Sequence, residues 1–164
     1  MTQRDPDEEV LAVLRASPGR RWLGVGSLSF MGVLLVYVAF ATPPAALVWQ
    51  LFLLVVGAGA LWAAEMMRRA TMSTILLTET GLFDEDGTVI APVRDIDSID
   101  RGFFAFKPSN GFLLRLKSQS PRQWRPGMWW RLSRRVGVGG MTPGHQAKNM
   151  SEIIAIMLAR RDGI

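Results

Sequence analysis

The side chains that could do acid, base or metal chemistry in this sequence are two acidic groups and one histidine. Asp84, Glu85 and Asp86 are consecutive, and Asp95, Asp97 and Asp100 form the second group. Neither group has the spacing of a calcium loop, and both lie beside residues typical of turns or strands. We therefore interpret both groups as solvated acidic edges rather than as a metal site.

Catalytic signatures are equally sparse. His145 is the sole histidine and follows Gly144, while cysteine is absent, so no nucleophile and base can be paired from the sequence. The sequence predicts a protein that is not an enzyme, with no catalytic residue, metal or cofactor.

Charge is distributed unevenly along the second half of the chain. Residues 65–100 contain eight acidic and three basic residues, whereas residues 101–148 contain ten basic and no acidic residues. Arginine and tryptophan alternate within this basic block, and both side chains favour the interface of an anionic membrane. We predict that the following residues contact the membrane or an anionic lipid: Arg122, Trp124, Arg125, Trp129, Trp130, Arg131, Arg134 and Arg135.

Two other interpretations of this basic block stay open. One or two of the tryptophans could belong to the core while the arginines face water, because tryptophan is usually well buried. Basic residues among aromatic residues also occur on nucleic-acid-binding surfaces. A nucleic-acid partner is the less favoured alternative, because the sequence contains no recognition motif and the positive-inside rule already explains the excess arginine.

A long uncharged segment precedes this block. Residues 22–64 contain no Asp, Glu, Lys, Arg or His, and Pro43 and Pro44 interrupt the segment near its middle. Residues 22–41 and 45–64 would each rise about 30 Å as helices, which is the thickness of the hydrocarbon core of a bilayer. The sequence therefore predicts a transmembrane hairpin within residues 22–67.

Aromatic and small residues give this hairpin a register. Trp22 and Trp62 are expected at one membrane interface, and Tyr37 and Trp49 at the other. Small residues at matching depths predict close packing of the two helices: Gly24, Ser27 and Gly32 on the first, and Gly57, Ala60 and Ala64 on the second. The same small residues could instead bind another membrane protein.

Arginines flank the hairpin on one side only. Arg15, Arg20 and Arg21 precede it and Arg68 and Arg69 follow it, so both termini are predicted to be cytoplasmic in a multi-pass protein of a cytoplasmic membrane. A cleaved secretory signal is the alternative. It is less favoured because an acidic segment precedes the apolar run and a second span follows at once.

The segments outside the hairpin have different predicted structures. Residues 1–21 are predicted to contain a short amphipathic helix capped by Asp5, with Pro6 in its first turn. Residues 71–164 are predicted to form a mainly antiparallel β domain closed by a helix over about 149–161, with Asn149 and Glu152 as a capping pair. Its expected strands are 74–77, 88–90, 93–99, 103–106, 112–117 and 129–138, with turns at Asp86–Gly87 and Asn110–Gly111.

The opening strands of this domain carry a resemblance. The run from Leu77 through Thr78, Glu79, Thr80, Gly81 and Leu82, followed by Gly87 to Ile90 and then 93–99, resembles bacterial pleckstrin-homology-like (PH-like) domains that follow a transmembrane hairpin. The resemblance implies a bent antiparallel sheet capped by a C-terminal helix, in a protein of the bacterial inner membrane. The tryptophan-rich residues 119–130 depart from the pattern, and the sequence leaves open whether they form a loop, core or membrane-inserted segment.

These observations favour one function over two others. We predict a non-catalytic accessory or assembly factor whose cytoplasmic domain binds a partner protein, in a membrane complex, or anionic lipid headgroups. A small structural subunit of a larger membrane complex is the alternative, and a membrane-tethered nucleic-acid binder is the third.

Overall fold

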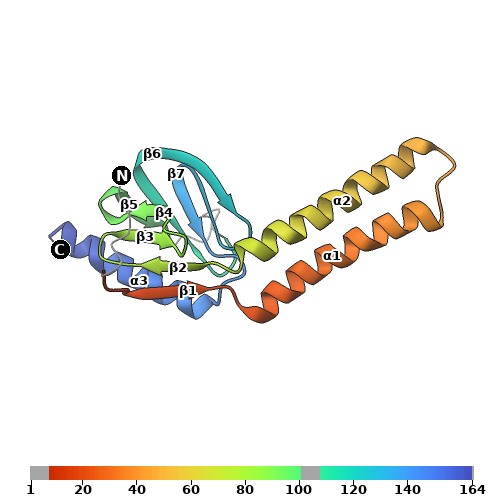
Figure 1. Cartoon of the computed structure of the whole chain (residues 1–164). Coiled ribbons are helices and arrows are strands. Elements are labelled where there is room, and N and C mark those ends of the chain that lie inside the picture. Colours follow the sequence, from red (N-terminus) through yellow and green to blue (C-terminus); the bar gives the residue numbers. More distant parts are fainter. Residues whose placement is uncertain (1–7, 101–107, 164) are drawn as a thin grey trace. The chain divides into compact units, whose positions relative to one another are not determined.

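The computed structural model describes residues 8–100 and 108–163, which divide into two compact units (Figure 1). Pro18–Arg69 form a helical unit. Met1–Ser17 and Ala70–Ile164 together form a sheet unit, so the chain leaves this unit once and returns to it. Both segments that flank the helices consequently belong to one folded body.

Two long helices make up the helical unit. α1 spans Pro18–Ala41 and α2 spans Leu47–Ala70, with the proline pair in the connection between them. Only 17% and 11% of the residues in their most apolar stretches are buried, unlike a core helix of a soluble protein. The predicted hairpin of two exposed apolar helices, each long enough to cross a bilayer, is thus confirmed.

Small residues spaced by two helical turns pack the hairpin. The buried residues are Val25, Gly32 and Ala39 on α1, and Gly57, Ala64 and Ala70 on α2, of which Ala70 belongs to the sheet unit. A Cβ atom at Gly32 would lie 2.9 Å from the Gly57 carbonyl oxygen, so only glycine permits this approach. Near the connecting loop, Gln50 Nε2 donates a hydrogen bond to the Ala39 carbonyl oxygen at 3.0 Å.

The predicted packing residues are only partly correct. Gly57 is buried and Ala60 and Gly24 are half-buried, but Ser27 is exposed and its hydroxyl donates to the Leu23 carbonyl oxygen of its own helix at 2.6 Å. The predicted residues therefore lie on more than one side of the helices. The four predicted interface aromatics, Trp22, Tyr37, Trp49 and Trp62, are all exposed on the helix surfaces.

The first sheet of the sheet unit contains four antiparallel strands in sequence order. They are β1 (Ala12–Arg15), β2 (Thr74–Leu77), β3 (Gly81–Asp84) and β4 (Val89–Pro92). The predicted turn at Asp86–Gly87 joins β3 to β4, where Gly87 has φ +81 and its N–H donates to the Asp84 carbonyl oxygen. β3 itself was not predicted as a separate strand.

The predicted amphipathic helix near the N-terminus is wrong over the described residues. β1 pairs with β2, Leu14 lies opposite Ile75, and Leu14 is fully buried in the core. Glu8 adds a second tie, because its carboxylate accepts hydrogen bonds from the N–H and hydroxyl of Thr80 at 2.8 Å each. Asp5 and Pro6 lie outside the described residues.

The second sheet has the order β5-β6-β7 and is also antiparallel. A 3-10 turn, Val93–Asp95, leads into β5 (Ile96–Asp100), followed by β6 (Phe112–Arg125) and β7 (Trp129–Val138). Residues 119–125 therefore continue β6, and a tight turn then leads to β7. The predicted strand 103–106 lies outside the described residues.

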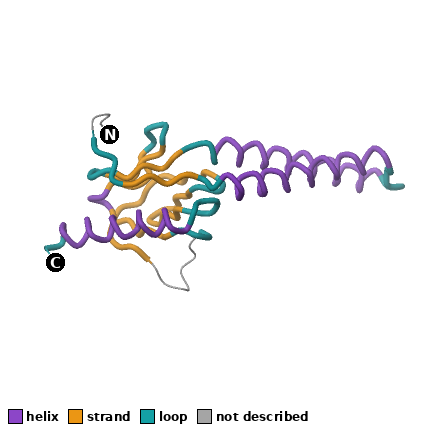
Figure 2. Tube along the Cα trace, turned by 90° about the horizontal axis from the view of Figure 1, so that it is seen from below, coloured by secondary structure: helices purple, strands orange, loops and turns teal. Residues whose placement is uncertain are grey.

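A final helix, α3 (Gly144–Arg161), closes the sheet unit (Figure 2). Its buried residues include Ala147, Met150 and Ile154, and it packs against β1 and β5. The predicted cap at Asn149 is wrong, because the helix starts at Gly144 after Pro143 and Asn149 lies inside it. The predicted fold class is otherwise confirmed: an apolar helical hairpin, antiparallel sheets and a C-terminal helix.

Candidate functional site

The eight residues predicted to contact lipid divide into a structural group and an exposed group. Trp129 belongs to the core, with 1% of its surface exposed. Its indole Nε1–H donates a hydrogen bond to Asp84 Oδ2 at 3.1 Å. The core interpretation, one of the two left open by the sequence, therefore holds for this tryptophan.

Arg125 and Arg131 also serve the fold. Arg125 forms an ion pair with Asp86, and its Nε lies 3.5 Å from Asp84 Oδ2. The Arg131 guanidinium donates to the carbonyl oxygens of Val89 at 2.8 Å and Ile90 at 3.2 Å, which joins β7 to the edge of β4. Burial lowers the pKa of Arg131, and with its donors used in this way the side chain has little capacity left for a ligand.

Asp84, the carboxylate near Trp129 and Arg125, has a different environment from the one expected from the sequence. Asp84 was expected on a solvated turn, but only 1% of it is exposed. It accepts hydrogen bonds from the Ser73 hydroxyl, the Trp129 indole and the Glu85 N–H. Burial raises the pKa of Asp84, and the Trp129 hydrogen bond offsets part of that effect. Its partners are all structural, so we assign it to the architecture of the sheet unit.

The exposed group includes a small aromatic surface on the β6–β7 hairpin, which we call the Trp124 surface. Its residues are Arg122, Trp124, Trp130 and Leu132. Trp124 and Trp130 are direct cross-strand partners, and strand alternation places Arg122 and Leu132 on the same face. Trp124 is 60% exposed and Leu132 is 52% exposed, and the four residues, with Gln123 and Arg131, line a hollow of about 290 Å³.

The Trp130 ring packs directly against Gly137, which leaves room for it because glycine has no side chain. A Cβ atom at Gly137 would lie 2.4 Å from atoms of the Trp130 ring, so the indole rests directly on the glycine. The contact joins residues from the two ends of β7, on either side of Ser133, which has φ +54. Trp130 consequently lies half-buried beside the more exposed Trp124.

The turn that follows Trp124 lies at the edge of the sheet unit from which the helices depart. A Cβ atom at Gly127 would lie 3.2 Å from the Thr71 side chain and 3.3 Å from Met141. The Met141 carbonyl oxygen in turn accepts a hydrogen bond from the Ser17 N–H at 2.7 Å. Ser17 directly precedes α1 and Thr71 directly follows α2, so the residues that connect the sheet unit to both helices lie beside this turn.

Arg134 and Arg135 lie in a second exposed group, which we call the Arg115 cluster. It consists of Arg115, Lys117, Arg134 and Arg135, which line a hollow of about 520 Å³ together with Asp97 and Leu116. The prediction of lipid-contacting residues omitted Arg115 and Lys117. The available signal was the alternation in 112–117, which places both on the wet face opposite the buried Leu114 and Leu116.

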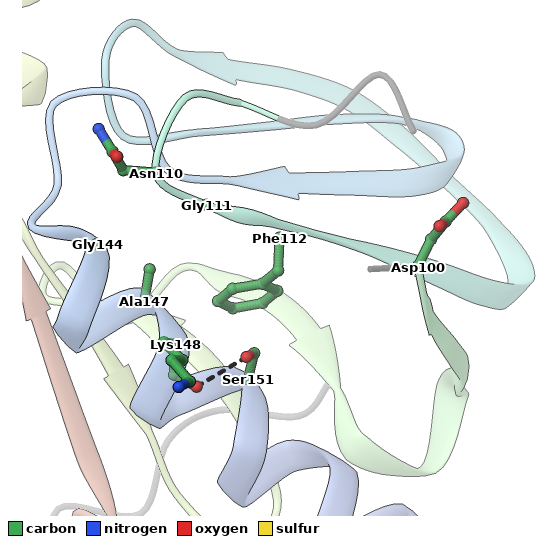
Figure 3. A pocket seen from close by; sticks show the side chains of 8 residues that line it. All are labelled: Asp100, Asn110, Gly111, Phe112, Gly144, Ala147, Lys148 and Ser151. Atoms are coloured by element: carbon green, nitrogen blue, oxygen red, sulfur yellow. Dashed lines mark hydrogen bonds between the residues drawn. The ribbon is translucent and has the colours of Figure 1, made fainter. Parts of the chain in front are cut away.

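A third hollow, of about 400 Å³, lies where α3 begins (Figure 3). Phe112 and Ala147 contribute apolar walls, and Lys148 and Asp100 lie on its rim. The Ser151 hydroxyl donates to the Lys148 carbonyl oxygen at 2.8 Å, and the Lys148 ammonium lies 3.8 Å from Glu152. These contacts are internal to α3 and point to no particular ligand.

Residues 8–100 and 108–163 contain no candidate metal site. No three His, Cys, Asp or Glu side chains in these residues come together as a metal site. His145 is exposed on the first turn of α3.

Comparisons with protein-family models, with curated proteins and with solved structures found no match. The resemblance to PH-like domains therefore stays a prediction, and the function must be argued from the surfaces described above.

Proposed function

We propose that this chain is a non-catalytic membrane-anchored binding protein, an accessory or assembly factor of the cytoplasmic membrane. In this proposal the sheet unit contacts anionic lipid headgroups through the Trp124 surface. The observation that carries it is an exposed tryptophan and leucine beside an arginine, on the hairpin whose turn lies next to the residues that connect to both helices.

Chain connectivity supports this contact. Trp124 precedes Gly127 by three residues, which span at most about 10 Å because the chain turns at Gly127. Gly127 contacts Thr71, the residue that follows the last residue of α2. If α2 spans the bilayer, the Trp124 surface is held close to its interface without any further docking energy.

The chemistry of the surface suits that interface. An indole ring places its apolar body and its N–H at the headgroup level, and Leu132 adds exposed apolar area next to it. Arg122 has no ion pair with any described carboxylate, and a basic side chain near anionic headgroups gains about 1 kcal/mol.

A single-cysteine probe tests this proposal on the full chain, because the protein has no cysteine of its own. Leu132→Cys, labelled with an environment-sensitive fluorophore, is reconstituted into nanodiscs of zwitterionic lipid with and without anionic lipid. We expect a blue-shifted emission that is quenched by spin-labelled lipid, with the larger shift when anionic lipid is present.

Ile156→Cys is the matched control. Ile156 is 54% exposed, close to the 52% of Leu132, but it lies twelve residues along α3 from Gly144, or about 18 Å. Its label should report water in both lipid mixtures. Identical, water-like emission from both positions would rule out the lipid contact.

One observation favours the alternative of a structural subunit. Gly26 and Gly59 lie on open sides of α1 and α2, where a Cβ atom added at either position would have nothing within 4 Å, and small lipid-facing residues permit another helix to approach closely. Mild-detergent purification from native membranes distinguishes the two. Stoichiometric co-elution with one complex, lost in Gly59→Val, would favour the subunit, whereas a mostly free pool favours the accessory factor.

A further inference from the structure

The Arg115 cluster gathers four cations around one open hollow. Arg115, Lys117, Arg134 and Arg135 line it, and Asp97 is the single carboxylate among the lining residues. No ion pair joins any of the four cations to a described carboxylate. The lining of the hollow therefore carries four positive charges and one negative charge.

Strand register is what brings the four side chains together. Arg115 on β6 is the direct partner of Arg135 on β7. The next register pair joins Ser120 to Ser133, so the four residues 116–119 face Arg134 alone, and Ser133 has the positive φ of +54. This bulge places Lys117 and Arg134 beside the Arg115–Arg135 pair.

The arrangement is unfavourable in the absence of a ligand. Like charges directly opposite each other on antiparallel strands destabilise the pair. The same sheet shows what arginine does where it serves the fold: Arg125 pairs with Asp86, and Arg131 donates to four acceptor groups. No comparable partner accompanies the Arg115 cluster, so an anion would relieve a repulsion that the fold itself leaves unrelieved.

Two carboxylates near the cluster, Asp97 and Asp162, do not cancel its four positive charges. Asp97 also acts on Arg161 at the end of α3, whose pKa is raised chiefly by hydrogen bonding to Asp162 and further by the charge of Asp97. The pKa of Asp162 is lowered chiefly by its hydrogen bond to Arg161, and the charge of Lys117 adds to this effect. The four cations of the cluster thus outnumber the two carboxylates, Asp97 and Asp162, that interact with it or line it.

We propose that the Arg115 cluster binds an anion bearing a phosphomonoester or diphosphate group. Three arginines offer planar, multi-donor forks that match phosphate oxygens, and Lys117 adds a point charge. Four cations suit a group with two or more negative charges better than a singly charged phosphodiester or carboxylate. The inference rests on the proposed function in treating the sheet unit as a binding module, but it uses none of the residues of the Trp124 surface.

The group could belong to a soluble ligand or to a lipid headgroup, and the experiment separates these sources. The full chain in phosphatidylcholine nanodiscs is titrated with inorganic pyrophosphate at fixed ionic strength, and binding is followed calorimetrically. We expect saturable binding that weakens at least tenfold in the double variant Arg115→Gln, Arg135→Gln. The matched control, Lys148→Gln with Arg160→Gln, removes the same charge from exposed positions on α3, outside both the cluster and the Trp124 surface, and should bind like the wild type.

A second arm repeats the titration with phosphatidic acid, a phosphomonoester lipid, in the nanodiscs. Loss of pyrophosphate binding in this lipid assigns the site to the headgroup, and unchanged binding assigns it to a soluble ligand; either result supports the site. Folding of the variants is verified by unfolding temperature, which should hold or rise in the double variant as the repulsion is removed.

Absence of saturable binding at millimolar pyrophosphate, or equal weakening in the control pair, would overturn the proposal. The fluorescent label at Leu132 reports separately on the membrane contact. A failure of that contact with intact pyrophosphate binding would reject the proposed lipid contact and leave this site standing, and the reverse pattern would reject only this site.

Discussion

At the scale of single residues, two carboxylates separated by one position have opposite environments. Asp84 is buried and its pKa is raised by that burial. Burial acts in the same direction on Asp86, but hydrogen bonds from Thr88 and the Arg125 charge outweigh it and lower the pKa of Asp86. Of these two carboxylates, only Asp86 therefore stabilises the folded state through its negative charge.

Asp86→Asn tests this assignment. The amide oxygen can still accept from the Thr88 N–H, now at 2.9 Å, while the charge that faces Arg125 is lost. Because the pair is partly exposed, the loss at neutral pH should be below about 1 kcal/mol. It is measured as the difference in unfolding temperature between variant and wild type across a pH series.

The sign of the pH effect follows from the lowered pKa. Stabilisation by the Asp86 charge is complete above the ordinary aspartate pKa of 3.8 and disappears as the pH falls from there towards the lower folded-state value. The two proteins should therefore converge in acid. A difference that persists or grows below the ordinary pKa would contradict the role given to the charge.

The tryptophans show how far sequence reasoning reaches at this scale. A basic and aromatic block was evident, and the core alternative for some of its tryptophans was recognised. Which ring is buried depends on strand register: Trp129 pairs with Arg125 on one face, and Trp130 pairs with Trp124 on the other. Register shifts near Ser120 and Ser133 separate these pairs from the rest of the two strands, and the sequence carries no plain signal for them.

At the scale of elements, β1 shows that pairing with a distant strand can outweigh a local sequence pattern. Val10, Leu11, Val13 and Leu14 have the spacing of an amphipathic helix, which explains the incorrect prediction. Pairing with β2, more than fifty residues away, overrides that local pattern and alternates burial along the strand. Such pairing is not visible in a single segment.

Leu14→Ala and Val13→Ala distinguish the strand from the helix. Leu14 is fully buried and Val13 is 39% exposed. The first change should cost about 2–5 kcal/mol and the second less than about 1 kcal/mol. Unfolding temperatures of the two variants provide the measurement, and equal losses would indicate one shared apolar helix face instead of a strand.

The sequence predicted both helices but not which side of each helix packs against the other. Length, absence of charge and the proline pair defined both spans, whereas the buried seam of Gly32 and Gly57 depends on which faces meet. Small residues outside the seam, such as Ser27, look the same in the sequence. Rotation is decided by packing that no single helix encodes.

Gly57→Val and Gly59→Val form a matched pair on α2 for testing this seam. A Cβ atom at Gly57 would lie 2.9 Å from the Val36 side chain and 3.1 Å from the Gly32 carbonyl oxygen, whereas one at Gly59 would have no neighbour within 4 Å. We expect Gly57→Val to destabilise the hairpin by about 1–3 kcal/mol, from overpacking, and Gly59→Val to leave it nearly unchanged. Stability in detergent titrations measures both, and a larger effect at Gly59 would place the seam elsewhere.

At the scale of the whole molecule, the sheet unit fixes the topology of the chain. β1 precedes α1 and pairs with β2, which follows α2, so both ends of the hairpin return to one folded body. If the hairpin crosses a bilayer, the two flanking segments lie on the same side of it. The positive-inside rule, applied to the arginines that flank the hairpin, predicts that this side is the cytoplasm.

Labelling of two single cysteines with a membrane-impermeant maleimide tests this topology most directly. Ala46→Cys lies in the exposed connection between α1 and α2, and Arg160→Cys is exposed on α3. We predict that Ala46→Cys is labelled in intact cells with a permeable outer envelope, whereas Arg160→Cys is labelled only after lysis. Labelling of Arg160→Cys in intact cells, or protection of Ala46→Cys until lysis, would contradict a hairpin that holds the sheet unit in the cytoplasm.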